Sequence, residues 1–166
     1  TLIRPDTKAI YVETPSNPMM SITDLRACAE LAHAHGLLLI VDNTFLSPYF
    51  QNPLLLGADI VIHSGSKFIS GHNDTIAGFL CTNDPVIADK IRLIAKTTGS
   101  TLSPFDSWLV IRGMKTLAVR MEQHQKNAIK IANWLLKQPQ ITAVFYPGLK
   151  NHPGYATGIG QAKGFG

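Results

Sequence analysis

The sequence is poor in the features that mark several protein classes. Only two of its 166 residues are cysteines, Cys28 and Cys81, and they form no C-x-x-C pair. The cysteines therefore support neither a disulfide framework nor a zinc site, and we expect both to be small core residues. No apolar run is long enough to span a bilayer and no signal peptide is visible, which favours a cytoplasmic protein with no membrane partner.

Clusters of one charge sign are also missing. The net charge is +4 and the isoelectric point is near 9.2, which could suit an anionic partner. However, the basic residues are scattered, and the densest region, residues 112–137, alternates them with apolar residues at helical spacing. No basic run or aromatic stacking platform accompanies them, so we expect a solvated helix face and no nucleic-acid partner.

The length and composition suit one respectable hydrophobic core, since 45% of the 166 residues are hydrophobic. Both ends look interrupted, however. The sequence starts at Thr1 without an initiator methionine, and a strand pattern begins almost at once. At the other end it stops at a loop-like Gly-Phe-Gly. We therefore expect the middle of a longer chain, and residues 1–166 expressed alone should be poorly soluble or molten and catalytically silent.

The hydrophobic pattern predicts an α/β fold. In chain order it indicates a strand at residues 9–13, a helix from Thr23 or Asp24 to Gly36, a strand at 37–41, a short crossover, and a strand at 59–63. Continuous apolar strands joined by a helix and a crossover are typical of a parallel sheet covered on both faces. Beyond them we expect strands at 77–82 and 141–146 and helices at 85–97, 105–112 and 117–137.

The residues with reactive or ligand-binding side chains lie where these strands end. Asp42 follows one buried strand, while Ser64, Ser66 and Lys67 follow the next. In open α/β sheets, binding sites lie at the carboxyl ends of the strands. Pyridoxal phosphate (PLP) needs a lysine for its aldehyde, a carboxylate against its pyridine nitrogen, and hydroxyl or N–H groups around its phosphate. The pattern therefore predicts a PLP site.

Other interpretations compete for these residues. Asp42 could simply cap a turn and Lys67 could point into water, and the spacing alone does not decide between this and a cofactor site. Ser64 and Lys67 also fit the S-x-x-K motif of serine β-lactamases, but that serine should open a long helix, and no K-T-G element accompanies it. His33 and His35 would point to different faces of a helix, and His63 and His72 have no acidic or cysteine neighbour at ligand spacing except Asp74 near His72. Structural roles are therefore favoured over a metal site.

At these residues the chain resembles the Cys/Met-metabolism family of PLP enzymes, which includes cystathionine γ-synthase, cystathionine γ- and β-lyases, methionine γ-lyase and O-acylhomoserine sulfhydrylases. The similarity covers almost the whole chain. The matching segments are ETPSNP (13–18), VDNTF (41–45), GAD (57–59), HSGSK (63–67), GH (71–72), RGMKTL (112–117), RM (120–121) and YPGL (146–149).

The resemblance implies a role for each matching residue. Lys67 would form the Schiff base with the cofactor and Asp42 would pair with its pyridine nitrogen. Ser64 and Ser66 would bind the phosphate, Asn17 would lie near the phenolic oxygen of the ring, and Thr44 would support the ring face. The family usually has threonine at position 66 and alanine at 65. Serine keeps the hydroxyl, and we expect Gly65 merely to loosen the loop.

The resemblance also implies an architecture and an activity. We expect a fold-type-I PLP transferase-like large domain, with a mostly parallel sheet, over residues 1–138, and the start of a small domain at 139–166. The ring-stacking and carboxylate-binding groups would lie outside this chain. The protein would be a homotetramer with sites shared across a dimer interface. We favour cystathionine γ-synthase or another γ-replacement that uses O-acylhomoserine. A cystathionine or methionine lyase is the alternative, and a non-catalytic fragment is a remote one.

Overall fold

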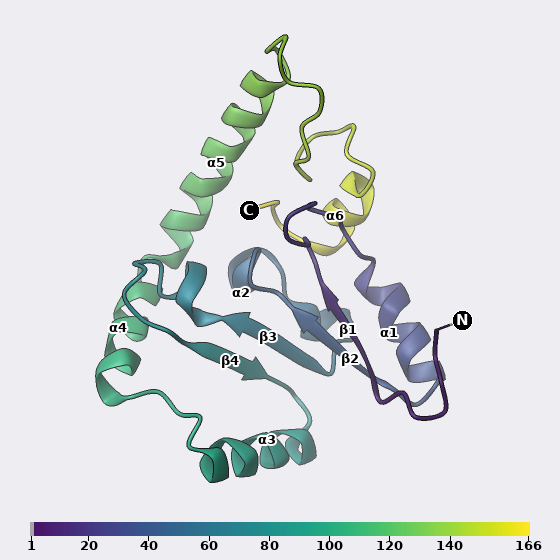
Figure 1. Ribbon diagram of the computed structural model, residues 1–166, viewed down its shortest axis with the longest axis vertical. Coiled ribbons are helices and arrows are strands. Elements are labelled where there is room, and N and C mark those ends of the chain that lie inside the picture. Colours follow the sequence, from purple (N-terminus) through teal and green to yellow (C-terminus); the bar gives the residue numbers. More distant parts are fainter. Residues whose placement is uncertain (1) are drawn as a thin grey trace.

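The structure is a computed structural model that describes residues 2–166. Its centre is a four-stranded sheet in the order β1-β2-β3-β4 (Figure 1). The strands are β1 (Ala9–Glu13), β2 (Leu38–Asp42), β3 (Ile60–Ser64) and β4 (Gly78–Cys81). The first three are parallel, and β4 runs antiparallel to β3 at the sheet edge. The expected mostly parallel α/β sheet is therefore confirmed.

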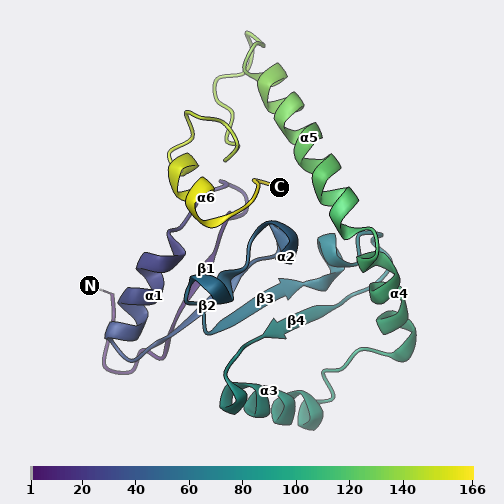
Figure 2. The same cartoon turned by 180° about the vertical axis from the view of Figure 1, so that it is seen from behind.

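Helices and helical turns connect the strands and follow them. They are α1 (Leu25–Ala34), α2 (Ser47–Phe50), the 3-10 turn η1 (Pro53–Leu56), the π-helical turn η2 (Gly65–Ile69), α3 (Pro85–Thr98), α4 (Pro104–Met114), α5 (Leu117–Leu135) and α6 (Tyr155–Gln161). Helix α5 extends away from the sheet, and the chain then returns to place α6 beside the amino-terminal elements (Figures 1 and 2). Within residues 2–166, no helix has the length and apolar character to cross a membrane.

The main core lies between α1 and the parallel strands. Asp24 caps α1, because its Oδ1 accepts the Ala27 N–H at 3.1 Å, a contact that typically stabilises a helix by about 1 kcal/mol. Helical spacing then buries one face of α1 against fully buried Leu39 and Val41 of β2. This packing holds the carboxyl end of β2, and with it Asp42, in a fixed position.

Two local expectations are wrong. Residues 141–146 have neither strand nor helix, because within residues 2–166 no strand pairs with them and Tyr146 packs against α5 through Ala132. A strand without a partner would leave its backbone N–H and C=O groups unpaired. Cys81 is exposed at the end of edge strand β4, while Cys28 is partly buried against the main core.

Candidate active site

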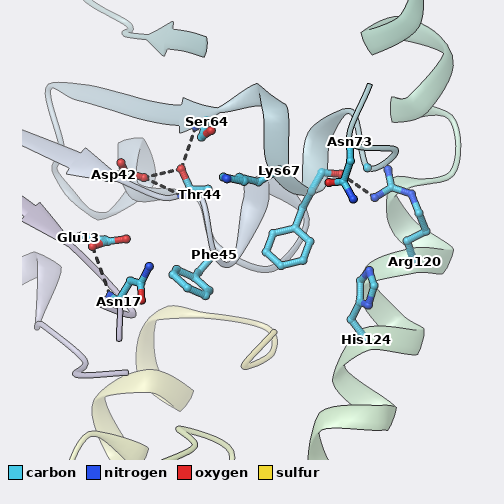
Figure 3. Close-up of a pocket in the computed structure, with 12 residues that line it drawn as sticks. Glu13, Asn17, Asp42, Thr44, Phe45, Ser64, Lys67, Asn73, Arg120 and His124 are labelled. Carbon is cyan, nitrogen blue, oxygen red and sulfur yellow. Dashed lines mark hydrogen bonds between the residues drawn. The ribbon is translucent and has the colours of Figure 1, made fainter. Parts of the chain in front are cut away.

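A cavity of about 500 Å³ opens at the carboxyl ends of the parallel strands (Figure 3). Its walls come from three strand ends, the turns that follow them, and α5. The lining residues are Glu13, Asn17, Asp42, Thr44, Phe45, Ser64, Lys67, Phe68, Gly71, Asn73, Arg120 and His124. Five of the six residues predicted for the site, all but Ser66, therefore face one cavity.

Asp42 ends β2 and is held by three hydrogen bonds. Its Oδ1 accepts the Thr44 backbone N–H at 3.0 Å and the Thr44 hydroxyl at 2.6 Å. Its Oδ2 accepts the Tyr11 hydroxyl at 3.3 Å. The Thr44 Oγ1 in turn accepts the Ser64 N–H at 2.8 Å, which ties the ends of β2 and β3 together. Charge-assisted bonds of this kind fix the orientation of a carboxylate that faces the cavity.

Tyr11 is a site residue that the sequence did not reveal. Strand pairing sets Tyr11 opposite Ile40, so its side chain lies diagonally across from Asp42, two residues further along β2. Local desolvation raises the pKa of the Tyr11 phenol although the side chain is exposed, and the nearby Asp42 carboxylate raises it further. The phenol therefore remains a donor to Asp42 at neutral pH. Only the register of β1 on β2 brings these two side chains together.

Lys67 lies in η2, the turn that follows β3. Its backbone angles, φ −91° and ψ −121°, depart from helical values in the middle of this turn. Hydrogen bonds close the turn around it, from the Ser70 N–H to the Gly65 carbonyl at 3.0 Å and from the Gly71 N–H to the Lys67 carbonyl at 2.8 Å. The amine extends across the cavity towards Thr44 and Asp42 (Figure 3).

The remaining predicted residues divide into two groups. Asn17 and Ser64 line the cavity, and the Asn17 N–H donates to the Glu13 carboxylate at 3.4 Å. Ser66 does not line it: its Oγ accepts the Ala77 N–H at 2.9 Å and thus joins η2 to the start of β4. The phosphate-binding role of Ser66 stays a prediction. Ser64 closes a strand and opens no long helix, contrary to what the S-x-x-K alternative requires.

Gly65 does not merely loosen its loop, and that expectation is wrong. A Cβ added there would come within 2.5 Å of Phe79 Cε2 and 2.9 Å of Ala77 Cβ. The Phe79 side chain occupies the space in which the usual family alanine would place its methyl group. Gly65 is therefore a packing position at which the turn and β4 approach closely.

Two further lining residues, Arg120 and His124, come from α5. They are one helical turn apart and face the end of the cavity away from Asp42 (Figure 3). The ring of His124 meets that of Phe68 edge-on, with centroids 5.6 Å apart. Sequence reasoning assigned neither residue a role. The signal was present, since Arg120 belongs to one of the motifs that carry the family resemblance.

A lysine and an aspartate that face one cavity from neighbouring strand ends form the arrangement used by PLP-dependent α/β enzymes. The model of the Cys/Met metabolism PLP-dependent enzyme family matches residues 1–166. The chain belongs to this family, and the resemblance drawn from its motifs is confirmed. The residues present fit the family's cofactor, because an amine, a carboxylate and hydroxyl groups converge on the same space.

Individual relatives cover nearly all of the chain. It is 50% identical over 164 residues to cystathionine gamma-lyase of Bacillus subtilis. The match covers 99% of this chain and 43% of that protein. It is 55% identical over 145 residues to cystathionine gamma-synthase of Haemophilus influenzae, covering 87% and 39%. The solved cystathionine gamma-lyase of Lactobacillus plantarum complexed with L-serine matches with a TM-score of 0.97 at 50% identity, over 99% of this chain and 43% of that one. The chain thus spans less than half the length of these relatives.

Proposed function

We propose that this chain carries the lysine half of the PLP site in an enzyme of sulfur amino-acid metabolism. The observation that carries the proposal is the convergence of Lys67 and the triply hydrogen-bonded Asp42 on one cavity. The cofactor, when bound, supplies an electron sink for charge that develops on the substrate.

Each site residue has a proposed task. Lys67 would hold the cofactor aldehyde, and its Nζ, once a substrate amine has taken its place, would accept the proton of the substrate α-carbon. Asp42 would keep the pyridine nitrogen protonated, and the bonds from Thr44 and Tyr11 hold the carboxylate in place. Asn17 would lie near the phenolic oxygen of the ring, Thr44 would support the ring face, and Ser64 would bind the phosphate. Ser66 would join in phosphate binding only by releasing its bond to the Ala77 N–H.

The favoured reaction is γ-replacement on an O-acylhomoserine, as in cystathionine γ-synthase. Asn73, which lines the cavity, motivates this choice. The family resemblance implies Gly-His-Ser-Asp in the lyases, whereas residues 71–74 read Gly-His-Asn-Asp. C–S bond cleavage by a cystathionine or methionine lyase is the second candidate. It is favoured by the relatives named cystathionine gamma-lyase, one of them 50% identical over 99% of the chain.

A single labelling experiment tests the site. The full-length protein is incubated with PLP, reduced with borohydride, digested and mapped by mass spectrometry. We expect visible colour before reduction and a label on Lys67 afterwards. A label on any other lysine, or no label, would contradict the proposal.

A product assay separates the two reactions. The full-length enzyme receives either O-acylhomoserine with cysteine or cystathionine alone. Formation of cystathionine from the first mixture supports γ-replacement. Rapid release of a 2-oxo acid from cystathionine, with no synthesis in the first mixture, would support the lyase reaction instead.

Three broader assignments are part of the same proposal. We place the end of the large domain near residue 138, because α5 ends at Leu135 and no regular element follows before α6. The complete enzyme is proposed to be a homotetramer of two tight dimers with shared sites, which light scattering of the full-length protein tests. A cytoplasmic location is supported by two free cysteines among the described residues and is tested by cell fractionation.

A further inference from the structure

The side chain of Arg120 is bonded almost entirely to backbone around the lysine turn. Its Nη1 donates to the Phe68 carbonyl at 2.6 Å, and its Nη2 donates to the carbonyls of Ile69 at 3.4 Å and Gly113 at 3.0 Å. Its Nε donates to the Thr116 hydroxyl at 3.0 Å. Two of these acceptors belong to the two residues that follow Lys67. The guanidinium thus links the lysine turn to α4 and α5.

Two glycines provide the space for this arrangement. Gly71 lies two residues beyond η2 at φ +74°, and a Cβ there would collide with the Arg120 guanidinium. Gly113 lies in α4, and a Cβ there would collide with the Ser70 carbonyl oxygen. The turn, the guanidinium and α4 are therefore packed at backbone contact distance. A larger residue at Gly71 would have to displace the guanidinium, and one at Gly113 would have to push the Ser70 backbone away from α4.

The charge of Arg120 could instead suggest a hook for a substrate carboxylate. Its bonding argues against that role, because the four hydrogen bonds use four of the five N–H groups of a guanidinium. Partial burial also lowers the pKa of the guanidinium, and within residues 2–166 no carboxylate forms an ion pair with it. A cation held in this way acts as a structural anchor.

We propose that Arg120 is a positioning residue that locks η2 and thereby fixes the Nζ of Lys67 against the cofactor. The inference rests on the proposed role of Lys67. Arg120 acts through its hydrogen bonds to the backbone carbonyls of the next two residues, Phe68 and Ile69, which hold the lysine in one orientation. Catalysis of this kind depends on reacting groups held near their productive geometry.

The first test compares Arg120→Met with Arg92→Met in the full-length protein. Arg92 is the matched control, because it is an exposed arginine on α3 that pairs with Asp89. Hydrogen exchange without cofactor reports on the turn through the amides of Ser70 and Gly71, which bond to carbonyls within it. We expect these amides to exchange at least about tenfold faster in Arg120→Met and to change less than about twofold in Arg92→Met.

The second measurement uses the cofactor as a probe of orientation. We expect Arg120→Met to retain PLP on Lys67 but to lose much of the visible circular dichroism of the bound cofactor, because a loosened turn no longer fixes its orientation. Arg120→Lys keeps the charge and a hydrogen-bonding ammonium group but loses the guanidinium fork, so it should restore part of both signals. This rescue also keeps the test informative if Arg120→Met fails to fold.

Glycine substitutions test the close contact between Gly71 and the Arg120 guanidinium separately. Gly71→Ala and Gly99→Ala both place alanine at positive φ, +74° and +73°, but nothing lies within 4 Å of a Cβ at Gly99. Gly71→Ala should therefore accelerate exchange of the turn far more than Gly99→Ala does. In the Arg120→Met background, the extra effect of Gly71→Ala should largely disappear, because the collision partner is gone.

Two outcomes would overturn the proposal. One is unchanged exchange and unchanged dichroism in Arg120→Met. The other is a rise in KM for the amino-acid substrate with those two signals intact, which would make Arg120 a carboxylate-binding residue. Failure of the proposed function looks different, because the wild-type protein would then carry no reducible PLP label on Lys67.

Discussion

Substitution of Gly65 by alanine tests how tightly the lysine turn packs on β4. The backbone of Gly65 lies outside the positive-φ region, so an alanine meets no conformational penalty there. The new methyl group would nevertheless lie 2.5 Å from Phe79 Cε2 and 2.9 Å from Ala77 Cβ. Either the Phe79 ring or the turn itself has to move.

The expected cost follows from two opposing effects. Overpacking a well-filled site by a methyl group costs about 1–3 kcal/mol. Alanine in a helical conformation gains about 0.5–1 kcal/mol over glycine, because the unfolded chain loses freedom. Gly65→Ala should therefore lower the free energy of unfolding by about 1 kcal/mol, within a range of about 0–2.5 kcal/mol. In a Phe79→Val background the ring is gone, and the same substitution should be nearly neutral.

A double-mutant cycle in urea measures this coupling directly. The four proteins are wild type, Gly65→Ala, Phe79→Val and the double variant, and the coupling should be at least about 1 kcal/mol. Gly160→Ala is the control, because a Cβ there meets nothing within 4 Å, so it should add independently to Phe79→Val. Additivity of Gly65→Ala and Phe79→Val within about 0.5 kcal/mol would refute the steric reasoning.

Three further predictions concern the site itself. Lys67→Ala should keep the unfolding midpoint of the cofactor-free protein but lower turnover at least about a hundredfold, because the proton carrier is removed; undiminished turnover would end its assignment. Asp42→Asn should fold and lose at least about tenfold in rate, or about 1.4 kcal/mol, because an amide cannot keep the pyridine nitrogen protonated; cofactor affinity and rate both within about threefold of wild type would contradict the ion pair. Burial lowers the pKa of His63 below its ordinary value of 6.5, and its Nδ1 has no hydrogen-bond partner among the described residues. The unfolded chain then takes up the proton first, so this group leaves stability unchanged above about pH 6.5 and lowers it as the pH falls further. His63→Gln should flatten the dependence of the unfolding free energy on pH in that range, and an unchanged slope would show that another group is responsible.

The order of the first elements could be predicted from the sequence because each has a local physical cause. Residues 37–41 form an unbroken apolar run typical of a strand in a parallel sheet, and most of this run became β2. The expected burial of both faces is wrong here, because Leu39 and Val41 are buried while Leu38 is exposed. Asp24 was one of two predicted caps, and its carboxylate does cap α1. The positions of Asp42 and Lys67 follow from the same logic, because parallel strands bring their carboxyl ends to one edge.

Other features depend on contacts between residues far apart in the chain, which leave no periodic pattern. The bond from Tyr11 to Asp42 exists because β1 pairs with β2 in one particular register. The collision of a residue 65 methyl group with Phe79 exists because β4 folds back antiparallel beside β3. Both depend on distances of a few ångströms across the sheet, and the local chain does not encode them.

The largest difference between pattern and structure lies at residues 141–146 and at the lysine turn. The apolar run at 141–146 has the composition of a strand, but a strand also requires a partner whose N–H and C=O groups complete its own. Lys67 was found from its position after a strand, whereas Arg120, 53 positions later, became visible only when α5 packed against η2. Local chemistry thus predicts which lysine is reactive, and tertiary packing decides which side chains surround its turn.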